Sequence, residues 1–423
     1  MRALAPLVAA SLVTLAACAD SAPTAPSDAA LKRSTTEPAT GPWSEIITGE
    51  TGPGSLYALY IPTSWNGDAV FYAHGIRPPQ EPVSLRDQDQ VYAVRDALGA
   101  MGYAVAYSSY SENGLAIKDG AQRTHQLRGL LASALKGQPD ESFLIGHSMG
   151  ALIAQNLAER FPNQYDGSLL VCGMLGGTPL ELEYIANVRA LFDFYYPGVL
   201  PGGVLDVPEG ASLTPALQGQ VIAAIGANPA GLFAIANTAQ TPLAFVPTAN
   251  PADWANPAST AFQTLVGSLL NALGYQLLGT NDVLDRTNGK SPFDNSETVY
   301  TVRSGGVVGP VPAPIINALV ASSNAGVARF EMPPSAENYL EKYYVPTGEL
   351  RDPTITMHTL FDPLVPYFHE VAFNGTVAAA GASSLLLHRP VAAYGHCAIP
   401  AGAVVQSFVD LATWASTGVR PVM

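Results

Sequence analysis

The chain of 423 residues is acidic, and hydrophobic side chains make up 48% of it. Its 34 acidic and 20 basic residues give a formal net charge of −14 at pH 7. This charge argues against nucleic acid as a partner, because binding to phosphates needs a basic surface. Once an export signal is removed, about 400 residues remain, which suits one core of about 250 residues with a large insertion better than two independent domains.

The N-terminus has the pattern of an export signal. Arg2 precedes an apolar stretch over residues 4–17, which is long enough for a signal peptide and too short to span a bilayer. We therefore expect a signal peptide at residues 1–17. The sequence Leu15-Ala16-Ala17-Cys18 resembles a bacterial lipobox, so Cys18 would carry the lipid of a membrane-anchored cell-envelope lipoprotein. The alternative is cleavage after Ala19, which would release a soluble secreted protein.

The next segments alternate in a way that predicts an α/β fold. Residues 18–42, rich in Ala, Pro, Ser and Thr, predict a flexible tether. Apolar runs typical of strands buried on both faces lie at residues 56–61, 69–73, 103–107, 142–145, 168–172, 354–359 and 384–387. Helical patterns lie between or after them at residues 88–101, 120–135, 149–160 and 401–415. This alternation predicts a mostly parallel sheet with helices on both faces.

The sequence Gly146-His147-Ser148-Met149-Gly150 lies between a short apolar run and a helical pattern. This is the order of strand, sharp turn and helix that a G-x-S-x-G nucleophile elbow requires. A serine hydroxyl is a weak nucleophile near neutral pH, so the turn must present Ser148 to a histidine that takes its proton. The alternative is an ordinary glycine-rich turn in which Ser148 is only a small residue.

An acid and a base follow Ser148 along the chain. Asp362 comes directly after the strand expected at 354–359, and His396 lies in a loop between the last expected strand and the last helix. Asp352 and Asp410 are the alternative acids, but Asp352 precedes the strand and Asp410 lies inside the last helix. The order nucleophile, acid, base is that of the α/β-hydrolase triad.

With these residues in place, the chain resembles the α/β-hydrolase fold superfamily of serine esterases and lipases. The resemblance covers residues 44–177 and 350–423, and it implies a core in two parts, at 43–179 and 341–423, around a cap insertion at 180–340. The loop His74-Gly75-Ile76 has the place of the family's oxyanion loop, so the N–H groups of Ile76 and Met149 would bind the developing negative charge. This chemistry needs neither a metal ion nor a cofactor.

The insertion contains an unusually long stretch with almost no charge. Between residues 210 and 281 the only charged side chain is Asp253. We expect a mainly helical lid over the catalytic centre whose inner face lines an apolar pocket, which would favour an acyl or aromatic ester. The alternative is that these residues only pack against one another and against the core. Pro229, Pro242, Pro247 and Pro251 interrupt the stretch and argue against a membrane span.

Two smaller groups of residues leave alternatives open. Cys172 and Cys397 would form a disulfide that braces the loop of His396, or would be two buried thiols if the backbone holds them more than about 7 Å apart. Asn and Asp residues gather between 281 and 295, but their spacing does not fit an EF-hand, so we expect them to serve in turns and expect no metal site there.

The sequence thus predicts an exported serine hydrolase that acts on a small-molecule or lipid-like carboxylic ester. Two alternatives remain, a peptidase of the same fold and a catalytically silent cell-surface binding protein. All three residues of the predicted triad are present, which argues against the silent protein.

Overall fold

The structure is a computed structural model that describes residues 35–37, 39–85 and 89–422. The expected signal peptide, the lipidation site Cys18 and most of the expected tether lie outside the described residues. The end of the expected tether differs from the prediction, because Thr35–Glu37 forms a short strand that pairs with residues 46–48. This backbone pairing adds an edge strand to the sheet.

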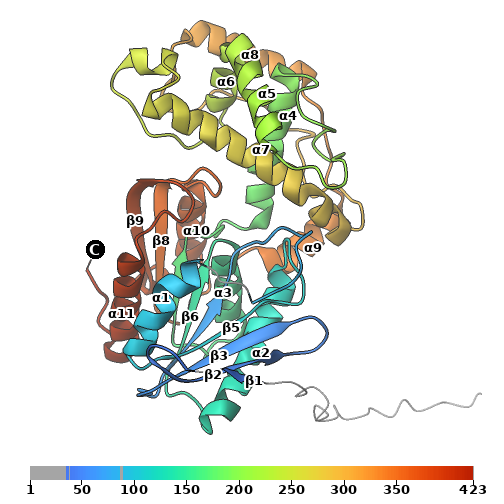
Figure 1. Ribbon diagram of the computed structural model, residues 1–423. Coiled ribbons are helices and arrows are strands. Elements are labelled where there is room, and N and C mark those ends of the chain that lie inside the picture. The colour runs from blue at the N-terminus through green and yellow to red at the C-terminus, as the bar shows by residue number, and fades with distance from the viewer. Residues whose placement is uncertain (1–34, 38, 86–88, 423) are drawn as a thin grey trace, which may run out of the picture.

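A nine-stranded sheet forms the centre of the molecule (Figure 1). Its strands are β1 (Thr35–Glu37), β2 (Trp43–Glu50), β3 (Leu56–Pro62), β4 (Ala69–Ala73), β5 (Ala104–Ser108), β6 (Ser142–His147), β7 (Gly167–Val171), β8 (Thr354–Phe361) and β9 (Leu386–Tyr394). Their order in space is β1-β2-β3-β5-β4-β6-β7-β8-β9. The six strands from β5 to β9 in this order pair in parallel, and the others pair antiparallel. The predicted α/β fold class, with a mostly parallel sheet, is confirmed.

Two strands differ from the sequence prediction. The prediction missed β2 (Trp43–Glu50), in which buried and accessible positions mix because the strand lies near the sheet edge. The last strand was expected at 384–387, but residues 383–385 form a short 3-10 turn and β9 runs on to Tyr394. The polar and proline-containing half of β9 hides its strand character, because only its first two residues are buried. The other predicted strands lie within about two residues of the observed ones.

Helices cover both faces of the sheet, and each face has its own apolar core. On one face, α1 (Asp89–Ala100) and α11 (Ala401–Thr417) bury side chains such as Leu98 and Phe408. The other face carries α2 (Ile117–Leu135), α3 (Met149–Arg160), α9 (Pro334–Tyr344) and α10 (Phe368–Ala379). Parallel strands need such cover because both of their faces are apolar.

The insertion between β7 and β8 forms a helical cap with a separate core above the carboxyl ends of the strands (Figure 1). Its elements are α4 (Thr178–Tyr195), α5 (Pro215–Ala227), α6 (Pro229–Ala236), the 3-10 helix η2 (Pro251–Ala255), α7 (Thr260–Arg286) and α8 (Ala313–Gly326). The chain re-enters the core through α9, which packs against α2 and α3. Many uncharged residues of the cap therefore do pack against one another, as one of the two predictions for this segment had it.

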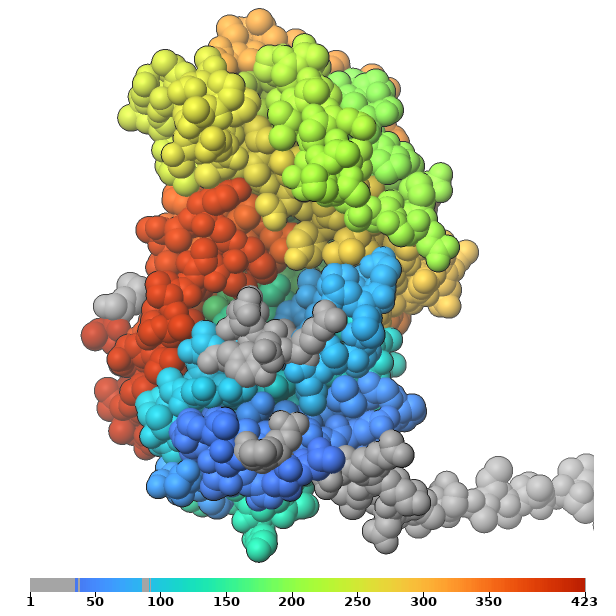
Figure 2. Space-filling view, in the orientation of Figure 1, coloured from blue at the N-terminus to red at the C-terminus, as the bar shows by residue number. Residues whose placement is uncertain are grey.

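The cap lies above the core and contacts the C-terminal part of the core (Figure 2). At this contact, α7 meets the last strand, β9. The hydroxyl of Tyr394 in β9 donates to the carbonyl of Thr264 at 3.0 Å. Over the described ranges, no single helix is long and apolar enough to cross a membrane. Helices α5 and α6 together have the required length and apolar composition, but the chain bends by 97° between them.

Candidate active site

Ser148 occupies a sharp turn between β6 and α3. Its φ of 56° and ψ of −126° lie in a region that side chains rarely adopt, and the two glycines of the motif make this turn possible. A Cβ atom on Gly146 would lie 2.1 Å from the carbonyl oxygen of Gly150, and one on Gly150 would lie 2.1 Å from that of Ala73. The sequence pattern therefore reflects a steric requirement of the elbow.

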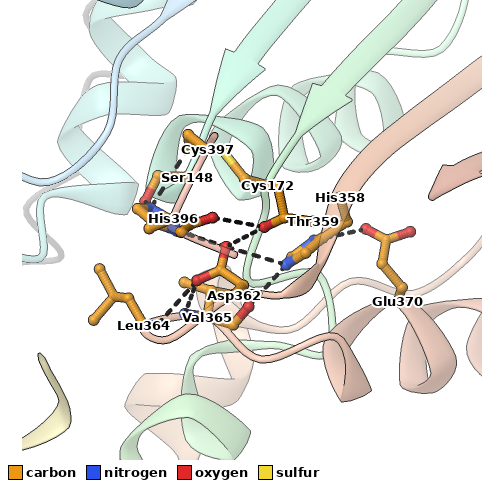
Figure 3. Close-up of a disulfide and its surroundings, with 11 residues drawn as sticks. Ser148, Cys172, His358, Thr359, Asp362, Leu364, Val365, Glu370, His396 and Cys397 are labelled. Atoms are coloured by element: carbon orange, nitrogen blue, oxygen red, sulfur yellow. Dashed lines mark hydrogen bonds and ion pairs between the residues drawn. A yellow bond between two sulfur atoms is a disulfide. The ribbon is translucent and has the colours of Figure 1, made fainter. Parts of the chain in front are cut away.

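The structure brings Ser148, His396 and Asp362 into one hydrogen-bonded chain (Figure 3). His396 Nε2 lies 2.9 Å from Ser148 Oγ, and His396 Nδ1 lies 2.9 Å from Asp362 Oδ2. The three side chains come from the elbow, the loop after β9 and the loop after β8. In this arrangement Nδ1 donates to the carboxylate, so Nε2 is free to accept the serine proton.

Asp362 is completely buried, and the backbone around it is arranged to hold a carboxylate. Its Oδ1 accepts hydrogen bonds of 2.9 Å from the N–H groups of Leu364 and Val365. The alternative acids are placed elsewhere, since Asp352 precedes β8 and Asp410 on α11 pairs with Arg389. Oδ2 of Asp362 faces His396 and also accepts a hydrogen bond from Thr359 Oγ1 at 3.4 Å.

A second histidine, His358, lies behind Asp362, and no sequence pattern predicted it there. His358 Nε2 lies 3.5 Å from Asp362 Oδ2 and donates to the Val365 carbonyl at 2.8 Å, while its Nδ1 lies 3.3 Å from Glu370 (Figure 3). Burial alone would lower the pKa of His358, but the hydrogen bond and charge of Glu370 more than offset this and raise it. The surroundings of His358 thus favour its protonated form beside the carboxylate of Asp362.

Glu370 lies between His358 and a third histidine, His388. Burial alone would raise the pKa of Glu370, but hydrogen bonds from His358 and His388 lower it to about 2. His388 Nδ1 lies 2.7 Å from Glu370 Oε2. The sequence signal for the cluster of His358 and Glu370 was weak. A histidine inside a strand and a glutamate early in a helix are each ordinary features when considered alone.

Cys172 and Cys397 are joined by a disulfide, with their Cα atoms 5.3 Å apart. Cys397 directly follows His396, and Cys172 directly follows β7 (Figure 3). The bridge thus ties the loop that carries His396 to the centre of the sheet. Two other contacts hold the same loop, from Thr359 Oγ1 to the Gly395 carbonyl at 2.8 Å and from the Gly395 N–H to Phe361 at 3.2 Å.

The predicted oxyanion donors lie beside Ser148. Ile76 and Met149 line the same cavity as Ser148, and a Cβ atom on Gly75 would come within 3.1 Å of the Ser148 Cβ. Neither N–H group donates to an acceptor among the described residues. His74 has a structural place in this loop, because its ring stacks on Tyr110 at 3.8 Å and its Nδ1 donates to the Gly75 carbonyl at 2.7 Å. Burial lowers the pKa of His74 to about 4, so the ring is neutral.

The cavity above Ser148 has mostly apolar walls, which come from both the core and the cap. Apolar side chains that line it are Leu115, Met174, Leu182, Ile185, Leu364 and Val365. Polar groups interrupt the walls at a few points, among them Thr178 and Glu181 on α4 and Tyr275 and Gln276 on α7. The inner face of the cap therefore forms a pocket, while the rest of the cap packs on itself.

The Asn and Asp residues between 281 and 295 were expected to serve in turns, but this prediction is wrong for some of them. Residues 281, 282 and 285 belong to α7, where Asp282 pairs with Arg286 at 3.1 Å and accepts from the Leu115 N–H at 2.7 Å. Asp294 accepts from Met332 and Ser296. Within the described ranges, the one cluster with metal-ligand spacing is Cys172, His396 and Cys397, whose sulfur atoms are used by the disulfide.

Comparison with known proteins gives distant structural matches alone. No known family profile and no curated protein matches this chain. The rice cell wall degrading esterase LipA from Xanthomonas oryzae is 14% identical, with a TM-score of 0.40 over 87% of this chain and 89% of that one. Feruloyl esterase B from Aspergillus oryzae is 12% identical, with a TM-score of 0.45 over 89% and 82%. Lipase A from Candida antarctica is 14% identical, with a TM-score of 0.42 over 90% and 78%.

These structural neighbours are esterases and lipases. Their low identities and TM-scores below 0.5 carry no argument about the activity of this chain.

Proposed function

We propose that the chain is a serine hydrolase that cleaves carboxylic esters through a covalent acyl-enzyme. The observation that carries this proposal is the pair of 2.9 Å contacts that links Ser148 to His396 and His396 to Asp362. The buried carboxylate fixes the imidazole with Nε2 toward the serine, which is the orientation that a general base needs.

In the first step, His396 Nε2 takes the Ser148 proton while Ser148 Oγ attacks the acyl carbon. The protonated imidazole is stabilised by Asp362, and it then gives its proton to the leaving alcohol as the tetrahedral intermediate collapses. Water, activated by the same histidine, hydrolyses the acyl-enzyme and restores Ser148. The N–H groups of Ile76 and Met149 would bind the oxyanion of both tetrahedral intermediates, because they line the cavity beside the nucleophile and have no acceptor among the described residues.

The apolar cavity supports a substrate with an apolar acyl or aromatic part. A preference of this kind is measured with p-nitrophenyl esters of increasing acyl length. We expect kcat/KM to rise from acetyl to medium-length acyl groups, because each methylene that leaves water for the pocket contributes about 0.8 kcal/mol. A strict preference for acetyl would contradict the apolar pocket.

We also propose that the protein is exported and acts in the cell envelope. The N-terminal pattern with Cys18 supports a lipid anchor, and the disulfide between Cys172 and Cys397 suits an oxidising compartment. Labelling with a radioactive fatty acid tests the anchor. Incorporation that is lost in Cys18→Ala supports it, whereas release of unlabelled protein into the medium supports the soluble secreted alternative.

The test of the catalytic proposal compares Ser148→Ala with Ser133→Ala, a serine on the exposed side of α2. We expect Ser148→Ala to lower kcat for p-nitrophenyl butyrate by several orders of magnitude at an unchanged melting temperature, and Ser133→Ala to keep wild-type activity. Equal turnover by wild type and Ser148→Ala would refute the proposal.

A further inference from the structure

Two polar side chains on α4 interrupt the apolar wall of the catalytic cavity. Thr178 and Glu181 lie one helical turn apart, and both line the cavity that Ser148 lines. The Thr178 side chain is completely buried and that of Glu181 nearly so, since Glu181 is 4% exposed. The triad does not use either residue.

His369 donates a hydrogen bond to one carboxyl oxygen of Glu181. The Gly176 N–H donates to His369 Nδ1 at 3.1 Å, so the hydrogen of the neutral ring sits on Nε2. Nε2 then donates to Glu181 Oε2 at 2.8 Å. Burial lowers the pKa of His369 to about 3, which keeps the ring neutral. Gly176 permits this approach, because a Cβ atom there would lie 2.9 Å from Nδ1.

Among the described residues, the other oxygen of Glu181 and the hydroxyl of Thr178 have no hydrogen-bond partner. Glu181 Oε1 makes no hydrogen bond to any described residue, and the same holds for Thr178 Oγ1. Burial raises the pKa of Glu181, and the charge of Asp362 raises it further. The Thr178 hydroxyl is a buried group without a partner, which is costly, and Glu181 lines the cavity with one oxygen unpaired. Together these two groups point to a polar group of a ligand.

We infer that Glu181 and Thr178 bind a hydroxyl group of the ester substrate. A hydroxyl both donates and accepts, so it pairs with Glu181 Oε1 whether that carboxyl is protonated or ionised. An ammonium group would need the ionised form, and a carbonyl group would need the protonated form. The inference rests on the proposed ester hydrolysis and narrows its substrate class to esters with a hydroxylated acyl or alcohol part.

Two pairs of substrates test the inference and tell the two parts of the ester apart. For the acyl part, p-nitrophenyl 3-hydroxybutyrate is compared with p-nitrophenyl butyrate. For the alcohol part, glycerol monobutyrate is compared with propyl butyrate. We expect wild type to prefer the hydroxylated member of one pair by about 10- to 100-fold in kcat/KM, because its hydroxyl satisfies groups that the plain analogue leaves unpaired.

Variants of α4 connect this preference to the two residues. Glu181→Leu should reduce the preference to less than about 3-fold, and Thr178→Val should reduce it in part. Glu181→Gln, which keeps polar atoms at both positions, should retain more of it than Glu181→Leu. Glu183→Leu is the matched control, because Glu183 lies on the same helix outside this cavity and should leave the preference unchanged. Thr178→Val and Glu181→Gln keep the test decisive if Glu181→Leu does not fold.

Several results would overturn the inference. One is a wild-type enzyme that hydrolyses the plain esters in a Ser148-dependent way with no preference for either hydroxylated partner. Another is a preference that survives both Glu181→Leu and Thr178→Val, and a third is a stronger preference for p-nitrophenyl 3-aminobutyrate. These results leave the proposed ester hydrolysis standing, whereas a lack of Ser148-dependent hydrolysis of all these esters would refute that proposal itself.

Discussion

The disulfide between Cys172 and Cys397 links the stability of the chain to its chemistry, and its removal makes two quantitative predictions. The perturbation is the double variant Cys172→Ser with Cys397→Ser. Neither serine can form the covalent bond, and the side-chain volume changes little. The variant therefore tests the cross-link itself.

The stability effect follows from the length of chain that the bridge closes. The two cysteines are 225 residues apart in sequence. In the chain-entropy description, a cross-link of this span raises the free energy of the unfolded chain by about 5 kcal/mol at 25 °C. We expect the unfolding midpoint of the double variant in urea to fall accordingly.

The effect on activity follows from the position of the bridge. Cys397 is the neighbour of His396, whose Nε2 lies 2.9 Å from the nucleophile. A displacement of the base by about 1 Å is enough to lower the rate by about 100-fold. Thr359 and Phe361 still hold Gly395 after the bridge is lost. We therefore expect a loss of about 10- to 100-fold in kcat/KM rather than complete inactivation.

The assay combines urea unfolding with ester hydrolysis, each with and without a reductant. Wild type should lose stability and activity when reduced, and the double variant should not respond to reductant. The reasoning is refuted if the double variant unfolds at the wild-type midpoint and retains wild-type kcat/KM.

Three further predictions concern the elbow, the acid and the charges behind it. Gly150→Ala should abolish folding or activity, because its Cβ would lie 2.1 Å from a backbone oxygen. The matched control is Gly129→Ala on α2, where a Cβ would meet no atom within 4 Å. This control should raise the free energy of unfolding in urea by about 1 kcal/mol. Asp362→Asn should lower kcat by about 10⁴-fold in steady-state kinetics. The amide NH₂ would donate to His396 Nδ1, so the ring proton would sit on Nε2, which could then no longer accept the serine proton. A variant with wild-type kcat would contradict this prediction. The pKa of Glu370 is about 2 in the folded chain and about 4.3 in the unfolded chain. The ionised carboxylate therefore stabilises the fold above about pH 4.3, and this stabilisation is lost as the pH falls toward 2. Unfolding free energies of Glu370→Gln should fall less steeply than those of wild type over that interval, and parallel curves would contradict the role of this carboxylate.

The parts of the fold that could be predicted are those with a strong local signal. Strands β4 to β7 are short apolar runs buried on both faces, and each was predicted within about two residues. Strand β2 and the second half of β9 lie toward the sheet edges and carry mixed patterns. Their strand character comes from pairing with neighbours, which a single segment does not reveal.

The same distinction applies to the site. Ser148, Asp362 and His396 could be singled out because each follows a strand and their order along the chain is distinctive. Glu181 and His369 could not, because they are 188 residues apart in sequence and meet only when α4 and α10 pack. His358 and Glu370 were likewise hidden, since each becomes notable through a buried partner. Long-range pairs of this kind leave no spacing pattern in the sequence.

The central claim is that Ser148 is the nucleophile activated by His396. Its most direct measurement is mass spectrometry after reaction with a fluorophosphonate probe. The account predicts one probe molecule per chain, located on the peptide that contains Ser148, with labelling strongly slowed in His396→Ala. A label on another residue, or labelling at the wild-type rate in His396→Ala, would contradict it.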